Sequence, residues 1–532
     1  MAGDAFGGTG VGTIIAVLAS FMIGGEAPLD PDEQDASDRD EPAEIRAVSF
    51  VHQPTAEAEN TETEPDTEPE QEPDAERWLG RIELPGAVLD FAVTIRPSES
   101  GWSGAIDIPA QNVAGLPLHA IKRTNDRIAF AAELPGLPEA NWPTWSFDID
   151  EGGGSAAGEL RQSGMRFEST LRLADSDEPI LRRPQHPTGP QPYRSIELAV
   201  PVETAAGSHT LSGTLTLPDA DAFGPGPYPA AILITGSGPQ DRDESIMGHK
   251  PFLVIAHHLA TRGIATLRCD DRGVGGSGGE FEGATSFDFA DDVRAQVDAL
   301  VAHEAIGSVG LIGHSEGALV APIVAADSEG HIDWLVLLAG PGVPGREVLA
   351  EQFRAIYRAD QGITDAAALD AMIAAQQAAF DATLAGDQAA ARSHITELVE
   401  LEYTATNQDP DGHREQVTRT IDETLAALNG PWFTAFLTLD PREYLRRVQQ
   451  PVLVLNGSLD TQVLHDQNVP AIADSLAEGG NGSVTVRVLE GLNHLFQPAT
   501  TGGVSEYGTI ETTFDEAALT LIADWINEQP GQ

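Results

Sequence analysis

The segment LIGHSEGALVAPIVA, residues 311–325, constrains the fold more than any other part of this sequence. Its Gly313, Ser315 and Gly317 follow an apolar run typical of a buried strand and precede an apolar run typical of a helix. A serine on such a turn adopts a strained backbone, and the chain passes so closely that glycine-sized neighbours are needed. The start of the helix also favours negative charge. The segment predicts a serine nucleophile, Ser315, with His314 in the variable position of the turn.

The remainder of residues 193–532 alternates strand-like and helix-like stretches. The expected strands are SIELAV, HTLSGTLTL, AAILIT, IATLRC, VGLIG, WLVLLAG, PVLVLNG and VTVRVLE. Alternation of this kind predicts a mostly parallel sheet covered by helices, and we assign 193–532 as the catalytic unit. An insertion rich in Ala, Glu, Gln and Leu, at about 344–447, follows the WLVLLAG strand and is expected to form a helical cap.

A serine hydroxyl becomes a nucleophile only when a base removes its proton, and that base needs an orienting carboxylate. A serine turn of the G-x-S-x-G type in a mostly parallel sheet is typical of the α/β-hydrolase fold, in which these groups follow the serine in the order acid, then histidine. Asp460, just after the PVLVLNG strand, is the favoured acid, with Asp466 as the alternative. His494 follows the last strand through a short turn and is the expected base. Three other histidines have simpler structural explanations, two within a helical pattern and one at a helix end: His257, His258 and His303.

The oxyanion of a tetrahedral intermediate needs two preorganised donors, usually backbone N–H groups. One is expected from Glu316, the residue after the nucleophile. The other is expected from residues 235–239, after the AAILIT strand, with Ser237 favoured over Gly238. An ordinary glycine turn is the alternative explanation of that loop. This chemistry needs no cofactor or metal, and the single cysteine, Cys269, excludes an intrachain disulfide or a cysteine-based metal site.

The N-terminal part contains three kinds of sequence. Residues 1–28 include an apolar stretch, 11–23, that is shorter than the roughly 20 residues of a membrane span but has the length of a signal-peptide core. We expect a signal peptide or N-terminal anchor, and therefore export to the periplasm, the medium or the envelope. Asp4 and the lack of Lys or Arg before the stretch leave a cytoplasmic location as the alternative. Residues 29–76 are dominated by Asp, Glu, Pro, Thr and Gln and are expected to form a disordered acidic linker.

Residues 77–182 consist of short alternating segments separated by Gly, Pro and Asn, which predicts a small antiparallel all-β domain, either a sheet or a small barrel. It carries no candidate catalytic set, so we expect a structural or substrate-presenting role, with binding to a surface or polymer as the alternative. A Pro-rich linker, 183–192, follows it.

The charge of the chain excludes nucleic acids and anionic membranes as partners. The 83 acidic and 30 basic residues give a formal net charge of -53, and such polyanions bind to basic surfaces, which this chain does not supply. This composition has two possible origins. One is adaptation to high salt, and the other is a GC-rich genome together with one acidic tail.

Several motifs together resemble bacterial carboxylesterases of the EstD type, which belong to the α/β-hydrolase superfamily and carry a serine aminopeptidase-like domain. The motifs are LITGSGPQDRDE, GHKPFLVIAHHLATRGIATLRCDDRGVGGSGG, GHSEGALVAPIVA, LVLNGSLDTQV and GLNHLFQPATTGGVSEYGTIETTF. The resemblance implies hydrolysis of short acyl esters by Ser315, Asp460 and His494, without a metal. It places the second oxyanion donor at Ser237 and Gly238, and it assigns Asp271 and Arg272 to a structural loop network. The acidic start of the chain and the long acidic linker depart from the family pattern.

The expected function is cleavage of small carboxylic esters through an acyl-enzyme on Ser315. A thioesterase or an aminopeptidase-like hydrolase is the alternative within enzymes, because the same triad serves all three and an acidic cap residue could hold a peptide amine. A binding protein with a vestigial hydrolase domain is the alternative outside enzymes. The oligomeric state cannot be read from the sequence.

Overall fold

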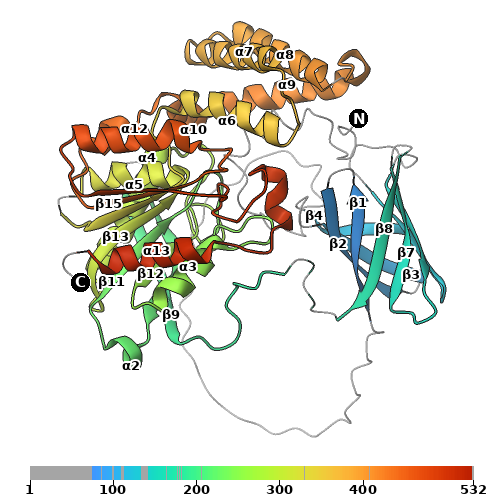
Figure 1. The fold of residues 1–532 in the computed structure, drawn as a ribbon, viewed down its shortest axis with the longest axis horizontal. Coiled ribbons are helices and arrows are strands. Elements are labelled where there is room, and N and C mark those ends of the chain that lie inside the picture. Colours follow the sequence, from blue (N-terminus) through green and yellow to red (C-terminus); the bar gives the residue numbers. More distant parts are fainter. Residues whose placement is uncertain are drawn as a thin grey trace, which may run out of the picture.

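The computed structural model describes residues 75–84, 87–98, 101–108, 113–133, 142–162, 165–175, 178, 180, 182–204, 207–328, 330–406 and 408–529. The expected signal peptide or anchor at 1–28 and nearly all of the expected linker at 29–76 lie outside these residues. The described residues form two sheets, a closed barrel followed by a larger mixed sheet with helices (Figure 1). The predicted fold class, an antiparallel β domain followed by an α/β unit, is confirmed.

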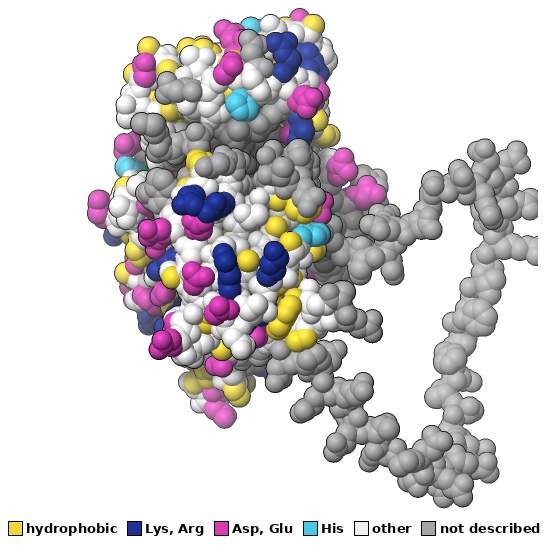
Figure 2. Space-filling model, turned by 90° about the vertical axis from the view of Figure 1, so that its right-hand side faces the viewer, with side chains coloured by type: hydrophobic (Ala, Val, Ile, Leu, Met, Phe, Trp, Pro, Cys, Tyr) yellow, Lys and Arg dark blue, Asp and Glu magenta, His cyan; other side chains and the backbone are white. Residues whose placement is uncertain are grey.

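The barrel is an eight-stranded antiparallel meander that closes when its last strand pairs with its first. The strands are β1 (Glu76–Leu84), β2 (Ala87–Ser98), β3 (Gly101–Ile108), β4 (Val113–Arg123), β5 (Arg127–Ala132), β6 (Thr144–Ile149), β7 (Ser155–Gln162) and β8 (Met165–Ala174). Alternate side chains, including Trp78, Phe91 and Phe147, fill the interior. Closure removes the exposed edges that an open sheet would present. Acidic and basic side chains are interspersed on the face shown in Figure 2, and ion pairs such as Arg81 with Asp90 join neighbouring strands.

The second sheet has the strand order β16-β15-β14-β13-β11-β12-β10-β9. Its strands are β9 (Tyr193–Thr204), β10 (Gly207–Pro218), β11 (Tyr228–Ile234), β12 (Ala265–Cys269), β13 (Ile306–His314), β14 (Trp334–Leu338), β15 (Val452–Gly457) and β16 (Val484–Leu489). β9 and β10 form an antiparallel hairpin at one edge, and β10 also pairs antiparallel with β12. The strands β11 to β16 run parallel to one another. The central strands are buried along their length because helices cover both faces.

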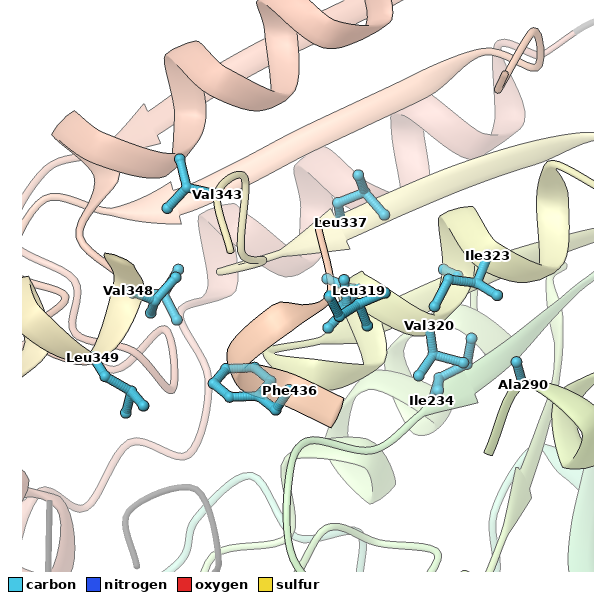
Figure 3. Packing of buried hydrophobic residues seen from close by; sticks show 14 of the residues in the cluster. Ile234, Ala290, Leu319, Val320, Ile323, Leu337, Val343, Val348, Leu349 and Phe436 are labelled. Atoms are coloured by element: carbon cyan, nitrogen blue, oxygen red, sulfur yellow. The ribbon is translucent and has the colours of Figure 1, made fainter. Parts of the chain in front are cut away.

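Side-chain alternation along these strands divides the core into two layers. One face packs against α3 (Pro251–Ala260) and α13 (Glu516–Asn527). The other packs against α4 (Ser286–Val301), α5 (Glu316–Ala325) and α12 (His465–Glu478). Figure 3 shows this second layer, where Ile234 and Leu337 of the sheet lie near Leu319 and Val320 of α5. A short helix, α2 (Ala220–Phe223), follows β10, and η4 (Val504–Thr509) precedes α13.

A helical insertion separates β14 from β15. It contains α6 (Gly345–Ala359), α7 (Ala366–Leu384), α8 (Gln388–Ala405), η3 (Asp411–His413), α9 (Arg414–Leu428), α10 (Pro431–Thr438) and α11 (Arg442–Leu445). Its own apolar side chains, among them Phe353, Phe380 and Tyr403, are buried between its helices. α10 also contacts α4 and α6, and Figure 3 shows Phe436 of α10 beside the second core layer. Within the described part of the chain, no helix is long and apolar enough to cross a membrane.

Candidate active site

Ser315 lies on a sharp turn between β13 and α5. Its backbone has φ 54° and ψ -116°, a conformation that a non-glycine residue adopts only when its surroundings enforce it. The Ser315 N–H donates to the Leu338 carbonyl at 2.9 Å. A Cβ added at Gly313 would lie 2.1 Å from the Gly317 carbonyl oxygen, and one added at Gly317 would lie 2.1 Å from the Ile234 carbonyl oxygen. Both glycines are therefore required by close backbone contacts.

These contacts give a first prediction. Gly317→Ala should lower the free energy of unfolding by about 1–3 kcal/mol, since the new methyl group must push apart backbone that cannot shift easily. Urea unfolding followed by circular dichroism measures the change. Gly482→Ala is the control, because Gly482 has no atom within 4 Å of the added Cβ and has no positive φ. Equal stabilities of the two variants would contradict the role assigned to Gly317.

Asp460 and His494 follow the neighbouring strands β15 and β16 and meet at the carboxyl edge of the sheet. The His494 Nδ1 atom lies 2.9 Å from Asp460 Oδ2, and both residues are buried. The other carboxylate oxygen, Oδ1, accepts hydrogen bonds from the backbone N–H groups of Gln462 and Val463 at 2.8 and 2.9 Å. Asn456 Nδ2 donates to Oδ2 at 3.0 Å. Asp460 is thus a fully hydrogen-bonded carboxylate aimed at an imidazole.

The alternative acid, Asp466, lies in the first turn of α12 and points to solvent. Its side chain is 91% exposed and contacts His465, whereas the Asp460 side chain is 0% exposed. The structure therefore brings Asp460, and not Asp466, to His494.

The serine and histidine segments meet through His314, the residue before Ser315. The His314 and His494 ring centroids are 4.8 Å apart, and His314 Nε2 donates to the His494 carbonyl at 3.0 Å. Within the described residues the Ser315 hydroxyl makes no hydrogen bond, including to His494. Catalytic hydrogen bonds are often long in unliganded sites and tighten when substrate binds.

The loop after β11 lies against the nucleophile. A Cβ added at Gly236 would lie 3.3 Å from Ser315 Cβ, and the Gly236 N–H already donates to Glu244 Oε1 at 2.8 Å. Within the described ranges, the N–H groups of Ser237 and Gly238 have no protein acceptor. Glu316 is the first residue of α5, so its N–H has no acceptor within the helix. These are the three N–H groups expected to hold an oxyanion.

The side chain of Glu316 joins the turn to the cap, a role that the sequence did not reveal. Its buried carboxylate accepts from Ser286 Oγ of α4 at 2.5 Å and from Trp432 Nε1 of α10 at 2.8 Å. Burial raises the pKa of Glu316, and the hydrogen bonds oppose that shift. A carboxylate within an otherwise apolar segment was the only signal of this link.

Most of the remaining sequence candidates have structural partners. Asp271 accepts from Thr235 Oγ1 at 2.8 Å and from the Gln240 N–H at 2.9 Å, which anchors the loop after β11. Arg272 pairs with Asp292 at 2.7 Å. His257 lies 3.2 Å from the Tyr193 hydroxyl, and the Ala305 N–H donates to His303 Nδ1 at 3.2 Å. His258 is the neighbouring residue of α3. Across the described ranges, no group of three or more His, Cys, Asp or Glu side chains is arranged to hold a metal ion.

Part of the chain is similar to known hydrolases. Residues 250–497 match the family described as serine aminopeptidase, S33 (Hydrolase_4). The chain is 27% identical over 288 residues to Esterase EstD from Thermotoga maritima, an alignment that covers 54% of this chain and 58% of that protein. The chain therefore spans little more than half the length of this curated relative. The resemblance to EstD-type esterases predicted from the motifs is confirmed.

Two solved structures are similar at low sequence identity. The Pyrococcus furiosus esterase Pf2001 has a TM-score of 0.37 and 16% identity, covering 66% of this chain and 98% of that chain. Est1E from Butyrivibrio proteoclasticus, solved with ferulic acid bound, has a TM-score of 0.34 and 17% identity, covering 62% of this chain and 97% of that chain.

Proposed function

We propose that this chain, whose residues 250–497 match the serine aminopeptidase S33 family and whose larger unit has the α/β-hydrolase fold, hydrolyses small carboxylic esters. One observation carries the proposal. A serine with a strained backbone directly follows His314, whose ring lies 4.8 Å from the ring of a buried histidine–aspartate pair, and a loop with N–H groups that have no acceptor among the described residues lies against the serine. The sequence similarity to a protein named as an esterase supports ester hydrolysis. Short acyl chains are the proposed substrates.

The proposed reaction begins when Ser315 Oγ attacks the ester carbonyl. His494 Nε2 takes the hydroxyl proton, while its Nδ1–H keeps donating to Asp460, whose carboxylate stabilises the imidazolium. The oxyanion is held by the Glu316 N–H and by an N–H of Ser237 or Gly238. Collapse of the intermediate breaks the bond to the alkoxy oxygen, which leaves as the alcohol with the proton from His494. A water then attacks the acyl-enzyme, with His494 as base again, and releases the acid and the Ser315 hydroxyl. No cofactor or metal takes part.

The substrate class can be tested with matched chromogenic compounds. We expect p-nitrophenyl acetate or butyrate to be cleaved with a kcat/KM at least a hundredfold above that for alanine p-nitroanilide, because an amide has the poorer leaving group. Release of p-nitrophenol and p-nitroaniline is followed by absorbance. Faster cleavage of the anilide would instead support an aminopeptidase, the activity in the family's description. Acetylthiocholine in the same assay tests the thioesterase alternative.

The binding-protein alternative has a direct test. A fluorophosphonate probe forms an adduct only with an activated serine. A folded protein without an adduct would support a vestigial site. Export of the chain, by a cleaved signal or an N-terminal anchor, remains a further proposal that rests on the apolar stretch at 11–23.

A further inference from the structure

His314 occupies the variable position of the serine turn, yet its side chain makes two specific contacts. The ring is buried, with Nδ1 2.9 Å from Glu244 Oε1 and Nε2 3.0 Å from the His494 carbonyl oxygen. A carbonyl oxygen can only accept, so Nε2 carries a hydrogen. The same Glu244 oxygen accepts the Gly236 N–H at 2.8 Å. Since a carboxylate oxygen has two lone pairs, it can accept from Gly236 and from His314 Nδ1 together, so this geometry has room for a hydrogen on both ring nitrogens.

Glu244 is held in position by its own strained segment. Its φ is 53°, in the left-handed region that side chains rarely adopt, and the residue is buried. Its N–H donates to the Asp241 carbonyl at 2.9 Å, and the Asp241 carboxylate accepts from the Asp243 and Ser245 N–H groups at 3.0 Å. Strain of this kind persists when the surroundings enforce it, and it concentrates at functional sites. Here the strained backbone places the Glu244 carboxylate within hydrogen-bond distance of Gly236, in the loop after β11, and of His314, in the serine turn.

The surroundings of His314 favour the charged ring. Burial on its own lowers the pKa of His314, but Glu244, the His494 carbonyl and Asp460 outweigh it, so that the pKa lies above its ordinary value. Among the described residues, the charged or titratable groups that act on the ring are Glu244, His494 and Asp460. A small pocket beside the ring is otherwise lined by apolar residues: Pro251, Phe252, Ile255, Leu338, Leu495 and Phe514.

We propose that His314 and Glu244 form a buried ion pair that positions the catalytic histidine and the oxyanion loop as one rigid unit. The ring fixes the main chain of His494, and the carboxylate fixes Gly236, next to the two candidate donors of the loop. The kinetic part of this proposal rests on the proposed function, whereas the protonation state does not.

The protonation state is tested without activity by ¹⁵N nuclear magnetic resonance of the histidine rings in the full chain, with His314→Gln assigning the signal. We expect both His314 nitrogens to be protonated at pH 7, and the ring to lose that proton only as the pH rises through its raised pKa. Glu244→Gln keeps the shape of the contact and should convert His314 to a neutral ring at pH 7. A neutral His314 in the unmodified chain would overturn the ion pair.

The positioning role is tested by the steady-state kinetics of ester hydrolysis. His314→Gln should lower kcat about 10- to 100-fold with little change in KM, because the contacts of the His314 ring with Glu244 and with the His494 main chain are lost. The double variant His314→Gln/Glu244→Gln should lower kcat to a similar extent, since both changes break the same pair. A folded His314→Gln with unchanged kcat would overturn the role. If the unmodified chain shows the doubly protonated ring but no esterase activity, the proposed function fails and the ion pair stands.

Discussion

Ser315→Ala is expected to lower kcat/KM for p-nitrophenyl acetate by roughly 10⁴- to 10⁶-fold, the loss typical of a removed nucleophile in a serine triad. The melting temperature should change by only a few degrees. Within the described residues the Ser315 hydroxyl has no hydrogen-bond partner, so its removal leaves no buried group unsatisfied. The positive φ at this position strains alanine as it strains serine. Steady-state kinetics and thermal unfolding measure the two effects.

A second serine provides the control for this variant. Ser483 is exposed, and Ser483→Ala should match the unmodified chain in turnover and in labelling by a fluorophosphonate probe. The probe should give one adduct in the unmodified chain and none in Ser315→Ala. Turnover or labelling that survives in Ser315→Ala would show that another group is the nucleophile.

The adjacency of Asp460 and His494 could be predicted because it follows from local pattern and sheet geometry. Each residue comes directly after a strand, and the carboxyl ends of parallel neighbours lie at one edge of the sheet. The choice between Asp460 and Asp466 was harder, since both follow β15 within ten residues. The choice depends on the turn after β15, where the Asp460 carboxylate accepts backbone N–H groups, whereas Asp466 already belongs to the first turn of α12.

The contacts that the sequence did not predict all join distant segments. Glu244 lies 70 residues before His314. The orientation of its side chain depends on a left-handed backbone conformation at Glu244, which no local sequence motif predicts. Trp432 lies 116 residues after Glu316 and reaches it only because the cap folds back over α4. In the N-terminal domain, alternation predicted antiparallel strands in a sheet or a small barrel, and it could not decide between the two because closure depends on the pairing of β1 with β8.

Asp460→Asn is expected to lower kcat about 10⁴-fold while the fold is kept, as for other triads in which the acid becomes an amide. The amide has one acceptor oxygen where the carboxylate has two. Two backbone N–H groups, of Gln462 and Val463, face Oδ1 and hold the amide oxygen on that side. The amide NH₂ then faces His494 Nδ1, which must become an acceptor. The histidine is therefore driven into the tautomer with hydrogen on Nε2, which cannot take the proton of Ser315.

Asp466→Asn is the matched control, since it makes the same chemical change at the exposed carboxylate of α12 and should leave kcat unchanged. Because Asn456 Nδ2 also points at Oδ2, the amide in Asp460→Asn meets a second donor there, and unfolding in urea should show a loss of about 1–3 kcal/mol. The tautomer can be read from the His494 ring nitrogens by ¹⁵N resonance, which separates a misplaced proton from a displaced ring. An Asp460→Asn variant with kcat within tenfold of the unmodified chain, or an Asp466→Asn variant with the larger loss, would show that Asp460 does not orient the base.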